Sequence, residues 1–242
     1  MRLINDRDAP QWLELMDETE LPTQSPDDIF LTAILFETAL AVIAVILGWA
    51  IGPSARAMIP EFDQLWPIAT GLAYGVLAAI PVLIFIDLVR RIPIEAVREL
   101  ERFSDDGMMK TLLELRPAEL IVISICAGVG EELLFRGWLM YWLAEGAGAT
   151  LGNPHPVALA LALIVSSIVF GLFHPITKLY VLLATVIGIY FGALVIFTEN
   201  LLIPIVAHAT YDAVQLIMAS RSESNNEPTS ENADDNDNTD VS

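Results

Sequence analysis

The chain has 242 residues, of which 55% are apolar, and a formal net charge of −19. The acidic charge argues against nucleic acid as a partner. The single cysteine, Cys126, excludes a disulfide framework and a cysteine metal cluster. A positive mean hydropathy, together with apolar runs of about 18 residues or more, is typical of a membrane protein.

Six apolar runs are long enough to cross a bilayer, and each predicts a helix. They cover residues 29–52, 67–89, 118–144, 157–174, 179–198 and 201–220. The sequence therefore predicts an all-α polytopic membrane helix bundle of about six transmembrane helices, formed by residues 29–220. The third run is long, about 40 Å as a helix, so we expect it to tilt or to project into the headgroups.

Both ends of the chain are acidic and fall outside these runs. Residues 1–28 carry eight acids and residues 221–242 carry seven. The C-terminal segment has almost nothing apolar to bury, which predicts a disordered acidic tail. In the N-terminal segment we expect one short helix around Trp12 and Leu13. The start of the chain lacks the apolar core of a cleavable signal peptide, so the first span is expected to direct insertion.

Residues 92–116 connect the second span to the third and have an amphipathic pattern. Ile94, Val97 and Leu100 recur every three residues, with charged residues between them. This pattern predicts a helix at the membrane interface, and an ordinary solvated connector helix is an equal alternative. The sequence Ser-Asp-Asp-Gly at 104–107 is expected to end that helix.

Basic residues are distributed unequally between the two sides of the predicted bundle. If both termini lie on one side, that side carries ten Lys and Arg residues, whereas the other side carries Arg56 alone. This asymmetry predicts that both termini are cytoplasmic. The chain has no eukaryotic targeting signal, which favours the bacterial inner (plasma) membrane. The ten residues are Arg2, Arg7, Arg90, Arg91, Arg98, Arg102, Lys110, Arg116, Lys178 and Arg221.

The third span carries three ionisable residues, Glu131, Glu132 and Arg136. Each costs roughly 2.5–3.5 kcal/mol near the centre of a membrane helix, so we expect them to have a function. Glu132 and Arg136 are four residues apart and can pair on one helix face. Glu131 points about 100° away from Glu132 and can face another group. A purely structural ion pair is the alternative.

Two further polar groups lie in later spans. Phe170 and His174 stand near the end of the fourth span, and His208 and Asp212 stand in the last span. A spacing of four places His208 and Asp212 on one helix face, where the carboxylate can orient the imidazole. A lone histidine in an apolar helix is usually a satisfied core residue. Two histidines accompanied by three carboxylates and an arginine make that explanation poor.

In this order along the chain, the three groups resemble the motifs of the CAAX prenyl protease and bacteriocin-processing (CPBP, or Abi) family of intramembrane proteases. They read Glu131-Glu132…Arg136, Phe170…His174 and His208…Asp212. The resemblance covers roughly residues 118–215. It implies an intramembrane endopeptidase that hydrolyses a peptide bond of a membrane-associated or peptide substrate with a water held inside the bilayer.

The resemblance also implies a role for each site residue. Glu131 would be the general base, and His174 would help to position the water. Glu132 with Arg136 would stabilise the site. His208, with the residue four positions later, would stabilise the oxyanion. These roles agree with elementary chemistry, because donors aimed at a developing oxyanion act strongly in a medium of low dielectric.

Asp212 departs from the pattern, because many relatives have asparagine there. A charged Asp would repel an oxyanion, so we expect it to be protonated or to orient His208. The acid also makes a zinc site possible, with Glu131, His174, His208 and Asp212 as ligands, and the family is often labelled metalloprotease. The spacing does not match a compact zinc motif such as His-Glu-x-x-His, so the use of zinc stays open.

Two other classes of function compete with the protease. A non-proteolytic scaffold or bacteriocin-immunity-type protein of the same fold would show a degraded motif, whereas all three motifs are present. A proton-linked carrier usually contains repeats, and none is evident. For the protease we expect a water-filled cavity that leads to Glu131. Its partners would be the lipid bilayer and a peptide or membrane-protein substrate, and the sequence shows no isoprenoid pocket.

Overall fold

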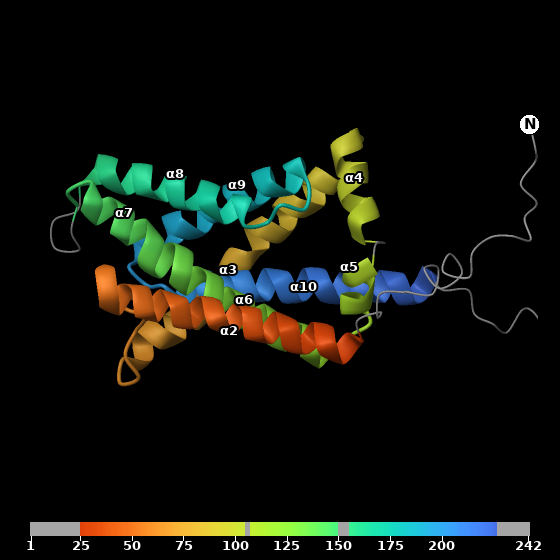
Figure 1. The fold of residues 1–242 in the computed structure, drawn as a ribbon, viewed down its shortest axis with the longest axis horizontal. Coiled ribbons are helices and arrows are strands. Elements are labelled where there is room, and N and C mark those ends of the chain that lie inside the picture. Colours follow the sequence, from red (N-terminus) through yellow and green to blue (C-terminus); the bar gives the residue numbers. More distant parts are fainter. Residues whose placement is uncertain (1–24, 105–106, 150–154, 227–242) are drawn as a thin grey trace, which may run out of the picture.

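The computed structural model describes residues 25–104, 107–149 and 155–226, and within these ranges the chain forms helices and no strand (Figure 1). The elements in chain order are α2 (Pro26–Ile51), α3 (Leu65–Arg90), α4 (Glu95–Ser104), α5 (Gly107–Leu113), α6 (Pro117–Glu132), the π-helix η2 (Leu133–Leu139), α7 (Met140–Gly146), α8 (Pro156–Leu172), α9 (Lys178–Thr198) and α10 (Leu202–Asn226). The predicted all-α membrane bundle is confirmed.

All six predicted spans are helical, but two of them differ in detail from the prediction. Four helices, α2, α3, α9 and α10, are long and apolar enough to cross a membrane. The third span forms one continuous helical rod from α6 through η2 to α7, with a π-helix where an uninterrupted α-helix was expected. The fourth, α8, ends at Leu172, two residues before His174. Pro175 explains this end, because a proline disfavours the α conformation of the residue before it.

Local sequence signals fix where several helices begin. Ser25 caps α2: its hydroxyl accepts a hydrogen bond from the Asp28 amide at 3.2 Å, and the Asp28 carboxylate accepts one from the Ser25 amide. The predicted helix start is therefore present as a capping box. Thr177 caps α9 in a similar way, with its hydroxyl 3.1 Å from the Tyr180 amide.

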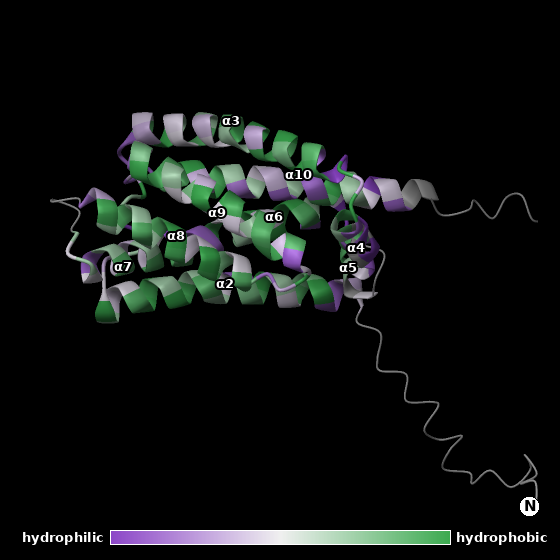
Figure 2. Ribbon diagram, turned by 90° about the horizontal axis from the view of Figure 1, so that it is seen from above, coloured by the Kyte–Doolittle hydropathy of each residue, from purple (hydrophilic) through white to green (hydrophobic). Residues whose placement is uncertain are grey.

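Helix α6 lies between α2 and α10, and α10 also packs along α3 (Figures 1 and 2). Two glycines of α6 allow these close contacts. A side-chain carbon at Gly128 would come within 2.7 Å of the backbone oxygen of Ile205 in α10, and one at Gly130 would collide with the backbone oxygen of Glu37 in α2. Small residues let membrane helices approach backbone to backbone. The end of α6, which carries the two glutamates, is consequently held between two neighbouring helices.

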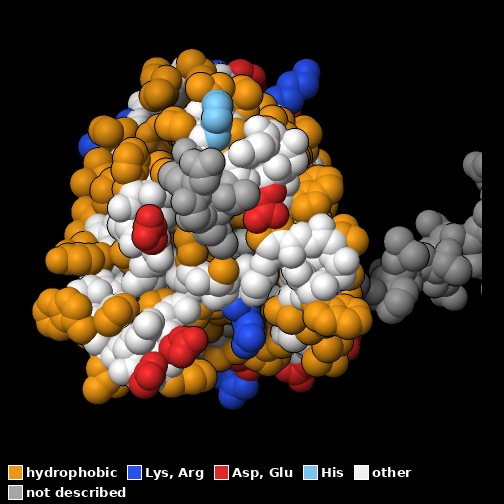
Figure 3. Space-filling view, turned by 90° about the vertical axis from the view of Figure 1, so that its left-hand side faces the viewer, with side chains coloured by type: hydrophobic (Ala, Val, Ile, Leu, Met, Phe, Trp, Pro, Cys, Tyr) orange, Lys and Arg blue, Asp and Glu red, His pale blue; other side chains and the backbone are white. Residues whose placement is uncertain are grey.

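The outer surface of the bundle is apolar along most of its length. Large hydrophobic side chains are exposed on α2 and α3, including Phe36, Trp49, Leu72 and Tyr74. Figure 2 shows hydrophobic residues on the long helices and hydrophilic ones on α4 and toward the end of α10. Seen end-on, hydrophobic side chains occupy much of the rim. Acidic side chains, backbone and side chains of other types (white) lie toward the middle (Figure 3). This distribution is that of an integral membrane protein.

Helix α4 is the amphipathic helix that the sequence predicts between the second and third spans. Val97 is buried, while Glu95 forms exposed ion pairs with Arg98 and Arg102 at 2.9 Å. The helix ends at Ser104 and α5 begins at Gly107, on either side of the predicted break. Whether α4 lies at a membrane interface or in solvent stays a prediction.

The two ends of the described chain lie at one end of the bundle. Helix α2 begins, and α10 ends, beside α5 (Figure 1). Residues 221–226, predicted to belong to the disordered tail, continue α10 as helix. The acidic segments 1–24 and 227–242, with the short helix expected around Trp12, lie outside the described residues. The cytoplasmic side of the bundle stays a prediction.

Candidate active site

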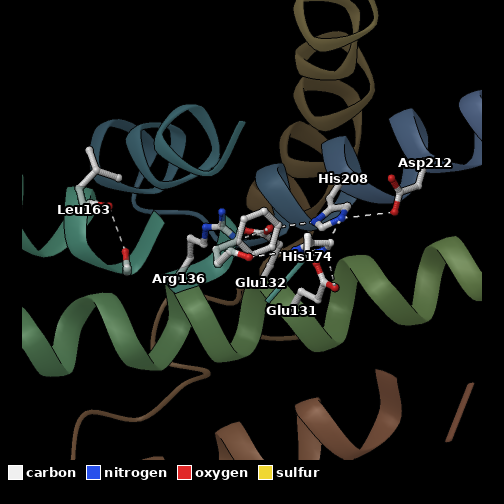
Figure 4. A network of polar contacts seen from close by, with 9 residues as sticks. Glu131, Glu132, Arg136, Leu163, His174, His208 and Asp212 are labelled. Carbon is white, nitrogen blue, oxygen red and sulfur yellow. Dashed lines mark hydrogen bonds and ion pairs between the residues drawn. The ribbon is translucent and has the colours of Figure 1, made fainter. Parts of the chain in front are cut away.

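The structure brings all six predicted site residues together in one network of polar contacts (Figure 4). Glu131 and Glu132 end α6, and Arg136 follows in η2. His174 lies in the turn between α8 and α9, and α10 supplies His208 and Asp212. A large part of this grouping could not follow from helical spacing, because it joins residues on three separate segments.

Glu132 and Arg136 form a fully buried ion pair, as the four-residue spacing indicates. Arg136 Nη1 donates to Glu132 Oε1 at 2.8 Å, and the two side chains are 1% and 0% exposed. The same carboxylate oxygen lies 2.9 Å from His208 Nδ1. Glu132 therefore links α6, η2 and α10, and its contacts give it a structural part in the site.

The guanidinium of Arg136 is also enclosed by aromatic rings. Its carbon lies 4.1 Å from the centre of the Phe170 ring and 5.9 Å from the centres of the Phe135 and Phe191 rings. Such cation–π contacts are worth about 2 kcal/mol or more when the cation is desolvated. Gly188 leaves room for the cation, because a side-chain carbon there would come within 2.8 Å of Nη2. No sequence motif pointed to a role for Phe191 or Gly188.

The π-helix η2 carries Arg136 immediately after the two glutamates. Its wider turn is marked by a hydrogen bond from the Met140 amide to the Phe135 carbonyl, five residues earlier. Short π-helices inside α-helices are frequent at functional sites. Sequence spacing did not predict this one, and nothing in the local residue types distinguishes it from an ordinary helix.

The carboxylate of Glu131 lies between the two histidines. Its Oε1 is 3.5 Å from His174 Nε2, and its Oε2 is 3.6 Å from His208 Nε2. His174 Nδ1 is 2.9 Å from the Phe170 carbonyl oxygen, which can only accept a hydrogen bond, so Nδ1 is the donor. His208 Nδ1 faces a Glu132 oxygen in the same way. Both rings are thus held by Nδ1 and turn Nε2 toward Glu131.

Asp212 completes the surroundings of His208. Its Oδ2 lies 3.3 Å from His208 Nε2, one helical turn away on α10, and its side chain is 24% exposed. The structure therefore places the acid where it can orient the imidazole, one of the two possibilities drawn from the sequence. His208 has a carboxylate near each ring nitrogen.

Of the four predicted zinc ligands, Glu131 lies near both His174 and His208, whereas Asp212 lies near His208. Among the residues that the structure describes, no group of three or more His, Cys, Asp or Glu side chains is arranged to hold a metal ion. In this arrangement the donors do not fit a complete zinc site, so no chemical step below depends on a metal.

One acid near the site has no counterpart in the sequence analysis. Glu37 of α2 has a buried carboxylate oxygen, Oε2, without a hydrogen-bond partner in the described part of the chain. Its backbone carbonyl faces Gly130, the residue before Glu131. The signal that could have found it is a single acid inside the apolar run of the first span.

A cavity of about 690 Å³ extends from the site toward the end of the bundle that carries α4 and α5. Its polar wall includes His174, Tyr180, Tyr211 and Asp212, and α4 and α5 supply apolar wall residues. The cavity also reaches the exposed side chain of Arg90. The cavity reaches His174, which contacts Glu131, and Asp212, which contacts His208, but Glu131 is not part of its wall. A water-filled path to Glu131 stays a prediction.

The fold and the site together define a membrane-embedded helical protein with a buried glutamate–histidine centre. A protein-family model described as Rce1-like, type II CAAX prenyl endopeptidase Rce1-like, matches residues 114–214. The matched segment contains all six predicted site residues and leaves out α2 and α3. The resemblance inferred from the motifs is confirmed for this segment, and at family level it supports a CAAX-protease-like intramembrane endopeptidase. Comparisons with curated proteins and with solved structures gave no match.

Proposed function

We propose that this protein is an intramembrane endopeptidase in which Glu131 activates a water molecule for attack on a peptide bond. The observation that supports this most is the position of the Glu131 carboxylate. It is buried, it lies between the Nε2 atoms of His174 and His208, and each histidine is held by its other nitrogen. Distances of 3.5–3.6 Å are long for direct hydrogen bonds and suit groups that share a third partner.

The proposed reaction begins with a water held by Glu131 and His174 Nε2. Glu131 takes one proton from the water, and the water oxygen bonds to the peptide carbonyl carbon. A tetrahedral intermediate results. Glu131 then delivers that proton to the leaving nitrogen, the carbon–nitrogen bond breaks, and a carboxylic acid and an amine are released. Proton transfer by one positioned group typically contributes 10²–10⁴-fold in rate, an order-of-magnitude range.

In this mechanism His208 stabilises the oxyanion of the intermediate. It can donate from Nε2 while Nδ1 stays bonded to Glu132 only when both ring nitrogens carry protons. Glu132 faces Nδ1 and Asp212 lies near Nε2, and the two carboxylates stabilise the positive charge of such a ring. We therefore assign Asp212 to orienting His208 rather than to direct contact with the oxyanion.

The substrate is proposed to be a peptide or a segment of a membrane protein that enters through the cavity. A volume of about 690 Å³ is within the usual size of ligand pockets. The apolar wall contributed by α4 and α5 suits apolar side chains of the substrate. If both termini are cytoplasmic, as the basic residues predict, the substrate enters from the cytoplasm, in a bacterial inner membrane.

Cleavage of a fluorogenic peptide panel by the purified protein in detergent tests this proposal. Wild type is compared with Glu131→Gln and with His174→Ala, and Glu145→Gln, an exposed acid of α7, is the matched control. We expect wild type and the control to cleave and the two site variants to lose at least 100-fold in kcat/KM. Zinc content, measured on the same samples, decides whether a metal accompanies the activity.

Two results would count against the protease. Equal cleavage by wild type and Glu131→Gln would remove Glu131 as the base. The second result has two parts: folded wild-type protein cleaves none of the panel, and Glu131→Gln replaces wild type in cells without loss of function. Together they would favour a non-proteolytic protein of the same fold.

A further inference from the structure

The cavity follows one face of α10 from the site to an exposed end of the bundle. The residues of this face that belong to the cavity wall include Asp212, Gln215, Ala219 and Ser222. Their spacing of three, four and three residues places them on one side of an α-helix, and His208, four residues before Asp212, continues the same side. His208 is buried, whereas Ser222 is exposed. This face of α10 therefore leads from the proposed oxyanion donor to the surface.

The length of the cavity corresponds to a definite number of residues of a bound peptide. Asp212 beside His208 and Glu223 near the end of α10 both line it. The two residues lie about 16 Å apart along the helix axis, at a rise of about 1.5 Å per residue. An extended peptide advances about 3.3 Å per residue. The cavity can therefore hold about five residues of an extended chain between the site and the surface.

The proposed reaction requires the substrate to be extended where it is cleaved. In an α-helix each carbonyl oxygen accepts a hydrogen bond from the amide four residues later, and side chains surround the backbone. A water held by the buried Glu131 can reach a peptide carbonyl only where such a helix is open. An extended chain leaves its N–H and C=O groups free, and in a membrane these groups need hydrogen-bond partners.

The wall of the cavity has a polar side and an apolar side that suit an extended chain. Between the site and the surface, α10 supplies Gln215, Ser222 and Glu223. The wall residues contributed by α4 and α5 are apolar, and Val97 and Leu113 are examples. A bound peptide can therefore turn its polar main chain toward α10 and its apolar side chains toward α4 and α5.

Arg90 of α3 lies at the outer end of the cavity. Helices α3 and α10 run side by side in the same direction (Figure 2), because a side-chain carbon at Gly71 would meet Leu202 and one at Gly75 would meet Val206. The same offset, continued along both helices, places Arg90 beside the last turns of α10. Its side chain is exposed and belongs to the cavity wall. The guanidinium is therefore close to the point where a bound peptide leaves the protein.

We propose that the cavity binds about five residues of an extended substrate on one side of the cleaved bond, and that Arg90 contacts the fifth of them. This inference rests on the proposed function. It adds a length requirement, since residues beyond the fifth lie outside the cavity. It also adds a preference at one position, because a guanidinium binds a carboxylate. Glu223, at the same end, has Lys110 at 4.0 Å, whereas Arg90 forms no ion pair within the described ranges.

A series of fluorogenic peptides tests the length. Peptides of one sequence are shortened residue by residue from either end, and kcat/KM is measured with the purified wild-type protein in detergent. On one side of the cleaved bond we expect kcat/KM to rise by at least about 10-fold in total up to the fifth residue, and to stay constant beyond it. Equal kcat/KM for peptides with two and with eight residues on each side would overturn this proposal, while the protease would stand.

Charge reversal at Arg90 tests which residue of the peptide reaches the surface. Peptides carry Glu or Lys at one position from the third to the seventh on that side, and the ratio of kcat/KM for Glu over Lys is measured at low salt. In Arg90→Glu this ratio should fall about threefold or more, with the largest fall at the fifth position. The control is Arg91→Glu, since Arg91 pairs with Asp87 and lies outside the cavity wall. It should keep the wild-type ratio.

The outcomes separate this inference from the proposed function. A largest effect at the third or the seventh position, equal effects in Arg90→Glu and Arg91→Glu, or no effect at any position would contradict the assignment of Arg90, although cleavage itself continues. If wild type cleaves no peptide of any length, the proposed function falls and this inference falls with it.

Discussion

The buried pair of Glu132 and Arg136 leads to the sharpest prediction about stability. Substituting Arg136→Met removes the cation but keeps an unbranched side chain of similar length. Glu132 then retains its contact with His208 and loses its ion-pair partner, and Phe170 loses the guanidinium 4.1 Å above its ring. Breaking one partner of a buried pair costs about 3–5 kcal/mol. For a domain of this size that corresponds to a fall of about 6–20 °C in melting temperature.

The double variant Glu132→Leu/Arg136→Met distinguishes the pair from the packing around it. Since it leaves no unpaired buried charge, we expect it to be more stable than Arg136→Met alone. The control is Arg91→Met, which breaks the ion pair of Arg91 with Asp87, whose side chains are 72% and 58% exposed.

Exposed pairs are worth about 0–1 kcal/mol, so this variant should unfold close to wild type. Each melting curve is recorded by circular dichroism in the same detergent. Equal losses for Arg136→Met and Arg91→Met, or a double variant less stable than Arg136→Met, would refute the reasoning.

Three further predictions follow from other parts of the structure. Gly130→Val should lower the melting temperature by several degrees because its side chain collides with α2, whereas Gly146→Ala, with nothing near its position, should not; a thermal shift assay compares them. Asp212→Asn, which keeps an oxygen acceptor, should lower kcat less than Asp212→Ala, and equal losses in the peptide cleavage assay would contradict the orienting role. Hydrogen bonds, above all from Arg98, hold the pKa of Glu95 below its ordinary value of 4.5. Their stabilisation of α4 is therefore complete above pH 4.5 and is lost as the pH falls through the lowered pKa. Amide hydrogen exchange in α4 should therefore quicken on acidification, and less so in Glu95→Gln.

Features that depend on position along one helix could be predicted from the sequence. Runs of apolar residues are long because a bilayer is thick, so all six helical segments could be placed from them. A spacing of four on a helix brings side chains together whatever surrounds the helix. For that reason the contact of Glu132 with Arg136, and that of His208 with Asp212, could both be anticipated.

Which of these helices meet, and which atoms face one another, depends on how the bundle packs. Glu132 and His208 are separated by 76 positions, and no periodicity in the sequence connects them. The aromatic rings around Arg136 come from η2, α8 and α9, so their arrangement depends on how these three helices pack. That packing follows from shape, and a contact such as Gly130 against α2 has the same sequence signal as any other glycine in a membrane helix. Helix geometry fixes neighbours within one segment, whereas neighbours between segments are fixed only when the whole bundle is assembled.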